Sequence, residues 1–241
     1  MDAVMSSFVE LLGKDGINIT DRQLQQFELY YQLLVEWNER MNLTAITDRE
    51  QVYVKHFFDS LTVSLVHPIT GAKRVADIGS GAGFPGIPLK IMFPDISLTI
   101  VDSLKKRIGF LQHVADRLGL KEVTLIHARA EDAGRDSAHR DRYDIVTARA
   151  VARLSVLNEL CLPFVRPGGV FIAMKGAQAR EELEESQFSL RQLQGELIED
   201  RVMLLPLEEA DRHLLVIRKK ADTPKKYPRK AGVPIKQPLV Q

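Results

Sequence analysis

The chain has 241 residues, 45% of them hydrophobic and 27% charged, and a formal net charge of +1; this composition excludes a largely disordered protein and allows one α/β domain with small additions. A single cysteine, Cys161, excludes an intramolecular disulfide framework and favours a reducing compartment. The N-terminal residues lack the pattern of a secretory signal, and no apolar run approaches the roughly 20 residues of a membrane span, so we expect a cytoplasmic protein without membrane contacts.

Residues 1–70 are predicted to form a helical extension packed on the core. Thr20 or Asp21 is a candidate N-cap for a helix whose apolar residues recur at three- and four-residue steps as far as WNERMN. A second amphipathic stretch covers residues 48–66 and is closed by the His-Pro pair that follows it.

From Lys73 the pattern changes to short apolar runs that alternate with helix-length segments. One such segment is 103–118, for which Ser103 is the predicted N-cap and Gly119 the stop signal. This alternation predicts right-handed crossovers and a parallel sheet with helices on both faces. The predicted strands are 74–78, 98–102, 122–128, 143–150 and 168–175.

Two later apolar runs, 201–207 and 213–219, are joined by the short linker EEADR. The pair is predicted to form a hairpin, which would place an antiparallel strand in the sheet. Such a strand favours the methyltransferase form of this sheet over the purely parallel dinucleotide-binding form. Residues 71–220 are therefore predicted to form the α/β core.

A glycine-rich stretch, VADIGSGAGFPGIPLK, follows the first predicted strand and allows two interpretations. Gly79, Gly81 and Gly83 make G-x-G-x-G, whereas Gly81, Gly83 and Gly86 make G-x-G-x-x-G, the spacing typical of dinucleotide binding. A ligand in an open parallel sheet lies beyond the carboxyl ends of the strands, where this loop falls. A tight turn without a ligand remains an alternative.

The residues around the loop favour a cofactor without phosphate. Pro85 and Pro88 remove two amide donors from the first turns of the next helix, where a pyrophosphate would bind. Asp77, at the end of the strand, would repel a diphosphate and fits the aminoacyl ammonium of S-adenosyl-L-methionine. We therefore expect S-adenosyl-L-methionine as the cofactor.

Acidic residues also follow the second and third predicted strands. Asp102 is placed to accept hydrogen bonds from ribose hydroxyls, although it is also a candidate helix N-cap. Ala130 and Glu131 follow the third strand, where Glu131 could approach the adenine region of the cofactor. A solvated side chain is the alternative for Glu131.

Six segments together resemble the RsmG, or glucose-inhibited division protein B, family over nearly the whole chain. The segments are WNERMNLTAI (37–46), KHFFDSL (55–61), VADIGSGAGFPGIPLKI (75–91), VDSLKKRIGFL (101–111), TARAVARL (147–154) and YPRKAGVPIKQPL (227–239). The resemblance implies a Rossmann-like class I S-adenosyl-L-methionine-dependent methyltransferase. It also implies methylation of N7 of a single guanine, position 527 in the 530 loop, of bacterial 16S ribosomal RNA.

The resemblance assigns further site residues. It implies cofactor contacts from the loop residues Gly79 and Phe84, from Asp102, Ser103 and Leu104, from Ala130 and Glu131, and from Arg149. It implies RNA contacts from the basic residues Arg129, Arg149 and Lys175. Two alternatives stay open: Phe84 could pack beneath the end of the sheet, and Arg149 could form a structural ion pair instead of a phosphate contact.

The implied reaction needs no general base, because N7 of a neutral guanine carries a lone pair and no proton. We therefore expect no catalytic acid or base, and alignment of the reactants as the source of rate. Cys161 lies in an apolar run and is expected to pack in the core. The histidines lack metal-ligand spacing, so no metal is expected; His56 could face the cleft, but a hydrogen-bonded structural role fits it better.

The C-terminal residues 221–241 form a basic tail. From Arg218 to Lys236 the net charge is +7, so the remainder of the chain sums to −6. We expect an extended strap that orders on RNA; a disordered tail is the alternative. Its expected RNA contacts, whose loss should weaken RNA binding without changing cofactor affinity, are Lys225, Lys226, Arg229 and Lys230.

The expected partner is 16S ribosomal RNA or the small ribosomal subunit, and no obligatory protein partner is evident. One alternative is a non-catalytic RNA-binding factor for ribosome assembly that uses the glycine loop only as a turn. A dinucleotide-dependent oxidoreductase is the other alternative, and the two prolines of the loop argue against it.

Overall fold

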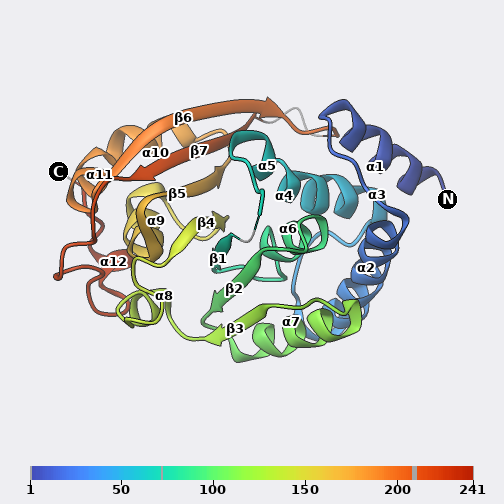
Figure 1. Cartoon of the computed structure of the whole chain (residues 1–241), viewed down its shortest axis with the longest axis horizontal. Helices are drawn as coiled ribbons and strands as arrows, with labels where there is room; N and C mark the ends of the chain where they lie inside the picture. The colour runs from blue at the N-terminus through green and yellow to red at the C-terminus, as the bar shows by residue number, and fades with distance from the viewer. Residues whose placement is uncertain (1, 72, 208–210, 241) are drawn as a thin grey trace.

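A computed structural model describes residues 2–71, 73–207 and 211–240. Within these ranges a seven-stranded sheet has the order β3-β2-β1-β4-β5-β7-β6 (Figure 1). The strands are β1 Arg74–Ile78, β2 Ser97–Asp102, β3 Val123–His127, β4 Tyr143–Arg149, β5 Val165–Lys175, β6 Gly195–Leu204 and β7 Asp211–Lys219. The pairs among β1 to β5 are parallel, and β7 is antiparallel to both of its neighbours.

The sheet separates two hydrophobic cores because successive side chains of a strand point to opposite faces. In β4, Ile145 belongs to the core shared with the N-terminal helices, and Val146 belongs to the other. In β5, Ile172 and Phe171 divide in the same way. Both faces of the sheet are therefore buried, as expected for a doubly covered sheet.

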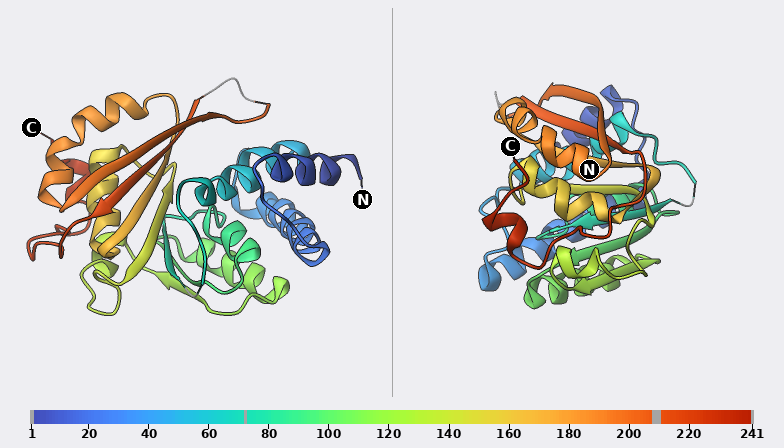
Figure 2. Two further views of the ribbon diagram at one scale, coloured as in Figure 1. Left: turned by 45° about the horizontal axis from the view of Figure 1, so that its top comes forward. Right: turned by 90° about the vertical axis from the view of Figure 1, so that its left-hand side faces the viewer.

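The helices cover both faces of the sheet, as Figures 1 and 2 show. One face carries α6 Gly86–Met92, α7 Lys105–Leu118 and the N-terminal helices α1 Ala3–Lys14, α2 Asp21–Met41, α3 Arg49–Val52, α4 Asp59–Leu61 and α5 Val63–Val66. The other carries α8 Ala130–Ala133, α9 Leu154–Cys161, α10 Ala179–Glu185, α11 Gln187–Gln192 and α12 Val233–Lys236. In the described part of the chain, none of these helices combines the length and apolarity needed to cross a membrane.

Helix α2 and the helical stretch 48–66 form at the predicted positions, whereas α1 had no separate prediction. Thr20 caps α2 through a capping box, in which its hydroxyl accepts from the Gln23 amide and the Gln23 side chain accepts from the Thr20 amide. The stretch 48–66 is helical, with a π-helix at Tyr53–Phe58 in its middle. Its buried side chains share a core with α6 and with the sheet, so these helices are packed on the α/β part of the chain.

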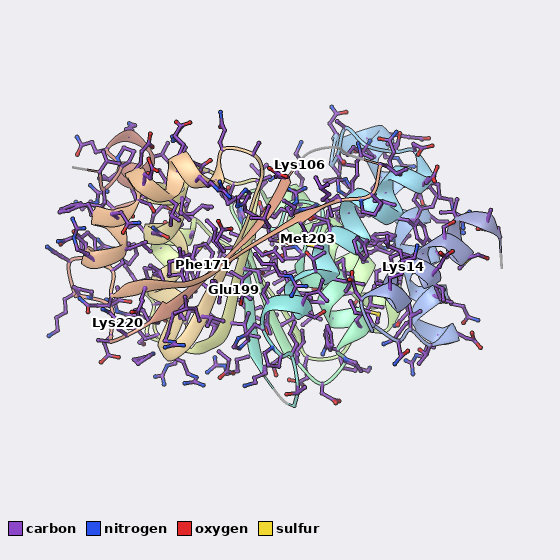
Figure 3. All side chains as sticks on the ribbon, turned by 90° about the horizontal axis from the view of Figure 1, so that it is seen from above. Lys14, Lys106, Phe171, Glu199, Met203 and Lys220 are labelled. Atoms are coloured by element: carbon purple, nitrogen blue, oxygen red, sulfur yellow. The ribbon has the colours of Figure 1, made fainter. Side chains whose placement is uncertain are left out.

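The predicted hairpin is confirmed, and β7 is the antiparallel strand inserted beside β5. The first strand of the hairpin is longer than predicted, because it begins at Gly195 rather than at residue 201. Part of the predicted linker, residues 208–210, lies outside the described residues. Figure 3 shows β6 from above, with Glu199 and Met203 labelled along it.

The predicted helix cap at Ser103 is wrong. Helix α7 begins at Lys105, and the amide of Leu104 donates to Asp102 Oδ1 at 2.9 Å. Asp102 therefore supplies the acceptor at this turn from the end of β2. The predicted stop at Gly119 is confirmed, since this glycine adopts the left-handed conformation at the C-cap.

Candidate functional site

The glycine loop after β1 uses left-handed backbone conformations. Gly79, Gly81 and Gly83 have φ of +72°, +62° and +105°, values that side-chain-bearing residues rarely adopt. A Cβ on Gly79 would lie 2.8 Å from Val151 Cγ2, and a Cβ on Gly83 would lie 2.5 Å from the Tyr30 hydroxyl oxygen. A Cβ on Gly81 would have no heavy atom within 4 Å. Gly81 is thus the loop residue whose missing side chain leaves open space.

Asp77 accepts hydrogen bonds that fix the conformation of this loop. Its Oδ2 accepts from the Ser80 hydroxyl at 2.6 Å and from the Gly86 amide at 2.8 Å, and its Oδ1 accepts from the Thr147 hydroxyl at 3.3 Å. Burial raises the pKa of this fully buried carboxyl to about 6, against these hydrogen bonds. The carboxylate has no exposed surface and organises the loop, and its expected contact with the cofactor ammonium stays a prediction.

The start of α6 offers no free amide to a phosphate. Pro85 and Pro88 lack amide hydrogens, and the Gly86 amide already donates to Asp77. The Ile87 amide donates to the Gly83 carbonyl at 2.8 Å. A pyrophosphate would find no donors here, which argues against the dinucleotide interpretation and fits a cofactor without phosphate.

A cavity of about 130 Å³ lies at the carboxyl ends of the first three strands, and we call it the β1–β3 cavity. Five of its lining residues were predicted to contact cofactor or RNA: Gly79, Ser103, Arg129, Ala130 and Glu131. The apolar part of its lining was not predicted and includes Ile78, Val101, Val151, Leu160 and Ile235. This mixture of apolar surface with a few polar groups fits a purine base such as that of S-adenosyl-L-methionine.

Asp102 joins the glycine loop to the start of α7. Its Oδ2 accepts from the Gly81 amide at 3.1 Å, and its Oδ1 accepts from the Leu104 amide. Arg107 Nη1 lies 3.5 Å from Oδ2. Each carboxylate oxygen can accept a second hydrogen bond, but the Asp102 side chain is only 2% exposed, so the ribose contact stays a prediction. Leu104 itself is 41% exposed beside this turn.

Glu131 lies in α8 and is buried, so the alternative of a solvated side chain is wrong. Its Oε1 accepts from the Gly232 amide at 2.7 Å. The carboxylate thus contacts the C-terminal segment at the edge of the β1–β3 cavity. Its expected contact with adenine stays a prediction.

A second cavity, of about 390 Å³, lies at the carboxyl ends of β4 and β5, and we call it the β4–β5 cavity. The consecutive residues Ala150 and Val151 line one cavity each, so the two cavities flank the segment that follows β4. The charged residues that line the β4–β5 cavity are Lys55, Asp59, Arg149, Lys175, Glu182 and Arg212.

Arg149 forms the structural ion pair that was one of its two alternatives. Its Nη1 donates to Asp59 Oδ2 at 2.8 Å and to the Lys55 carbonyl at 3.0 Å. Arg212 Nε lies 2.8 Å from the other Asp59 oxygen, although the two groups are not aligned for a hydrogen bond. One fully buried carboxylate therefore serves as the shared counter-charge of two guanidinium groups at the cavity wall, which leaves this triad with a net charge of +1.

Phe84 packs within the fold, as its alternative role predicted. It is 4% exposed, its ring centroid lies 4.6 Å from that of His56, and the Arg149 guanidinium lies 5.0 Å from the ring centre. His56 Nε2 lies 2.9 Å from Thr44 Oγ1. Burial and the nearby Arg149 lower the pKa of His56 to about 3, so the imidazole is neutral at pH 7 and has the structural role expected of it.

The basic residues predicted to meet RNA lie in different places. Lys175 ends β5, and its Nζ lies 2.7 Å from Glu182 Oε2 and donates to the Ala152 carbonyl at 2.8 Å. Arg129 is exposed and lines the β1–β3 cavity. Lys175 is only 8% exposed, and Glu182 balances its charge within the wall of the β4–β5 cavity.

The C-terminal segment is packed against the body through Arg135, Arg140 and Glu159, so the expectation of an extended strap that orders on RNA is wrong. Lys225, Lys226 and Lys230 are exposed, as an RNA surface requires. Arg229 differs from them, since its Nη2 lies 2.6 Å from Glu159 Oε2, and the side chain of Glu159 is 1% exposed. The role predicted for Arg229 therefore needs correction: its guanidinium is engaged by a buried carboxylate rather than held out for phosphate.

Sequence reasoning missed several residues of the two cavities. Asp59 stood inside the quoted KHFFDSL segment, where an acid among apolar helix residues was a usable signal. Ile235 is an apolar residue within a basic tail, and this was a weaker signal. Glu182 and Arg212 carried no signal, because they lie in charged segments that resemble solvated surface.

Comparisons with known proteins show the family of the chain. The sequence profile of GidB, described as rRNA small subunit methyltransferase G, matches residues 23–214. The chain is 56% identical over 232 residues to the Ribosomal RNA small subunit methyltransferase G of Oceanobacillus iheyensis, which covers 96% of this chain and 98% of the relative. It is 55% identical over 235 residues to the protein of that name in Halalkalibacterium halodurans, with coverage of 98% and 99%.

Solved structures show the fold alone. TrmN from Thermus thermophilus superposes with a TM-score of 0.54 at 16% identity, covering 69% of this chain and 53% of that chain. An S-adenosylmethionine-dependent O-methyltransferase from Thermotoga maritima gives 0.52 at 16% identity, covering 79% and 72%. The fold is that of the class I methyltransferases, and the chain belongs to the rRNA small subunit methyltransferase G, or GidB, family.

Proposed function

We propose that this protein transfers the methyl group of S-adenosyl-L-methionine to N7 of a single guanine in the 530 loop of bacterial 16S ribosomal RNA. The observation that carries this proposal is the identity of about 55% over nearly the whole chain with proteins named for small-subunit rRNA methylation. The arrangement of the two cavities supports it, because a small, largely apolar cavity and a larger basic cavity flank the same segment after β4.

The β1–β3 cavity is the better site for the cofactor. Gly79, Ser103, Ala130 and Glu131, all predicted cofactor contacts, line it, and the start of α6 lacks donors for phosphate. We assign the β4–β5 cavity to the target guanine, since it lies next to the first cavity and has the volume for a flipped base.

The chemistry requires no proton transfer. When bound, the cofactor supplies an electrophilic methyl group: its carbon–sulfur bond breaks as the bond to N7 forms, and the positive charge passes from sulfur to the purine. The residues of the β4–β5 cavity suit that change. Asp59 and Glu182 pair with Arg149 and Lys175, and His56 is neutral, so these acids reduce the positive potential that the four cations of the cavity would place against the charged ring.

The experiment that tests the function is transfer of labelled methyl from S-adenosyl-L-methionine to three acceptors: protein-free 16S RNA, intact small subunits and duplex DNA. Chain cleavage at N7-methylguanine then locates the product. We expect label at one guanine of the small-subunit RNA and none on DNA. A Gly81→Val variant, whose side chain would enter the open space at the loop, is the matched inactive control.

The same experiment distinguishes the alternative of a non-catalytic assembly factor. Such a factor would bind RNA and leave all three acceptors unlabelled. Label on a base other than guanine would overturn the assignment of the target. The preferred acceptor would show whether naked RNA or the assembled subunit is the substrate.

A further inference from the structure

The β1–β3 cavity is closed on one side by the end of the chain. Every other lining residue comes from residues 78–160, whereas Ile235 comes from α12 in the C-terminal segment. Ile235 is 60% exposed, so most of its side chain surface is still available to a ligand. A large exposed aliphatic side chain beside a small, largely apolar cavity is the observation to be explained.

A buried ion pair anchors this segment on one side. The Arg229 guanidinium contacts both Glu159 oxygens, with Nε to Oε1 at 2.9 Å and Nη2 to Oε2 at 2.6 Å, and the Arg229 amide donates to Oε1 at 2.7 Å. Glu159 precedes Leu160, which lines the cavity. Arg229 Nη2 also donates to the Gln237 carbonyl at 2.7 Å, so one guanidinium ties the two ends of the turn that carries Ile235 to α9.

A second anchor lies three residues before Ile235. Gly232 adopts a left-handed conformation with φ of +83°, and its amide donates to Glu131 Oε1 at 2.7 Å. Glu131 itself lines the β1–β3 cavity. The segment is thus held at two carboxylates, and each of them lies in or next to the cavity wall.

The approach to this turn is also fixed. Arg140 donates to the carbonyls of Thr223 and Tyr227 at 2.7 Å each, and Arg135 Nε donates to the Pro228 carbonyl at 2.8 Å. Tyr227 is 5% exposed. Because its backbone carbonyls are held by arginines from the α8–β4 connection, the segment reaches the cavity as an ordered wall.

We propose that Ile235 is the outer wall of the cofactor's purine pocket, and that Arg229 and Gly232 position it through Glu159 and Glu131. Val101, Leu160 and Ile235 supply aliphatic surface for a flat purine, which gains free energy when its faces are removed from water. The inference rests on the proposed function, because it takes the β1–β3 cavity as the cofactor site. It gives Arg229 a role in cofactor binding that the neighbouring lysines do not share.

The test is the dissociation constant of the full-length protein for S-adenosyl-L-homocysteine, the reaction product, measured by titration calorimetry without RNA. Ile235→Ala should weaken binding by about 5- to 10-fold, as expected for losing part of an aliphatic contact. Ile235→Leu should bind nearly as well as the unmodified protein. Val240→Ala is the matched control, since Val240 is an exposed aliphatic residue of the same segment that does not line this cavity.

A second pair of variants tests the positioning role. Arg229→Met should weaken binding of the same ligand, because it frees the turn from Glu159, whereas Lys230→Met should leave it unchanged. Thermal unfolding of each variant, followed by circular dichroism, establishes that the chain remains folded at the titration temperature. If Arg229→Met is unfolded at that temperature, the test rests on Ile235→Ala and Ile235→Leu, because these variants change an exposed side chain.

The outcomes separate the inference from the function on which it rests. An unchanged dissociation constant for Ile235→Ala overturns the inference alone, as does an equal loss in Val240→Ala. Failure of the unmodified protein to bind S-adenosyl-L-homocysteine or S-adenosyl-L-methionine overturns the proposed function, and the inference with it.

Discussion

Arg149 Nη1 donates to Asp59 Oδ2 at 2.8 Å, and this contact ties the end of strand β4 to the helices that precede the sheet. The Asp59 side chain is fully buried, and that of Arg149 is 12% exposed. Arg212 from β7 reaches the same carboxylate. The N-terminal extension therefore contributes the counter-charge for two cations of the β4–β5 cavity, so it is part of the site as well as a cover for the sheet.

Asp59→Ala should destabilise the protein strongly. Removal of the carboxylate leaves Arg149 and Arg212 without a counter-charge in a largely buried place. Breaking such a pair from one side costs about 3 to 5 kcal/mol. We expect a loss of that size in the free energy of unfolding, measured by urea denaturation at pH 7.

Glu181→Ala is the control for this prediction. Glu181 pairs with Arg153 at 3.0 Å, but the two side chains are 61% and 46% exposed. Water screens such a pair, so its loss should cost less than about 1 kcal/mol. Equal losses in the two variants would show that the Asp59 carboxylate is not the buried hub described above.

The decrease in the free energy of unfolding at acidic pH should depend on His56. The folded protein keeps this imidazole neutral down to its pKa of about 3, whereas an unfolded histidine protonates near 6.5. Below pH 6.5 the unfolded state therefore binds more protons, and the free energy of unfolding falls as the pH drops. From pH 7 to pH 5 the unmodified protein should lose about 2 kcal/mol more than His56→Gln.

Urea denaturation of both proteins at the two pH values measures this difference. Asp77 acts in the opposite direction, because its pKa is raised to about 6 in the folded state and its ionisation destabilises the fold as the pH rises. Asp77 is present in both proteins, so its contribution cancels in the comparison. Parallel pH curves for the two proteins would mean that His56 is not held neutral.

The sheet and its loop were predictable from local pattern. The short apolar runs of β1, β2 and β4 and the two prolines after the glycines carry their information within a few residues of sequence. Even the error at Ser103 was local in origin, since Asp102, one residue earlier, reaches forward to the same turn. Two adjacent candidates for one cap cannot be separated by propensity alone.

The roles of buried side chains were not predictable, because their partners are distant in sequence. Asp77 meets Thr147, 70 positions away, and Glu131 meets Gly232, 101 positions away. Asp77 lies near the end of a strand and Glu131 follows one, so each resembles a free ligand group in the sequence. The sequence does not show that strand β4 donates to Asp77 and that the C-terminal segment donates to Glu131.

Two glycines of the loop should respond differently to substitution. A Gly81→Val side chain would enter open space beside the loop and should weaken S-adenosyl-L-methionine binding by about 100-fold or more, since a single steric block commonly costs about 3 kcal/mol. Its φ of +62° adds a folding cost of about 1 to 2 kcal/mol. Equilibrium titration of the folded variant measures the affinity.

Gly83→Ala should act on the fold instead. Its Cβ would lie 2.5 Å from the Tyr30 hydroxyl oxygen and 2.8 Å from Ile87, both of them buried. Overpacking together with the left-handed backbone should cost about 3 kcal/mol of unfolding free energy, with cofactor affinity largely kept. The reverse pattern, a stable Gly83→Ala that binds no cofactor, would place the ligand on the other side of the loop.

The exposed lysines of the C-terminal segment should supply part of the RNA affinity. Each phosphate contact releases counterions, so replacing Lys225, Lys226 and Lys230 together with alanine should reduce the slope of log affinity against log salt by about 2. Arg229 is left intact, because its guanidinium is engaged by Glu159. Filter binding of a 16S RNA fragment over a range of salt concentrations measures the slope.

Alanine at three exposed basic residues elsewhere, Lys14, Arg22 and Lys121, is the charge-matched control and should leave the slope unchanged. Equal slopes for the two triple variants would show that the segment does not contact RNA phosphates.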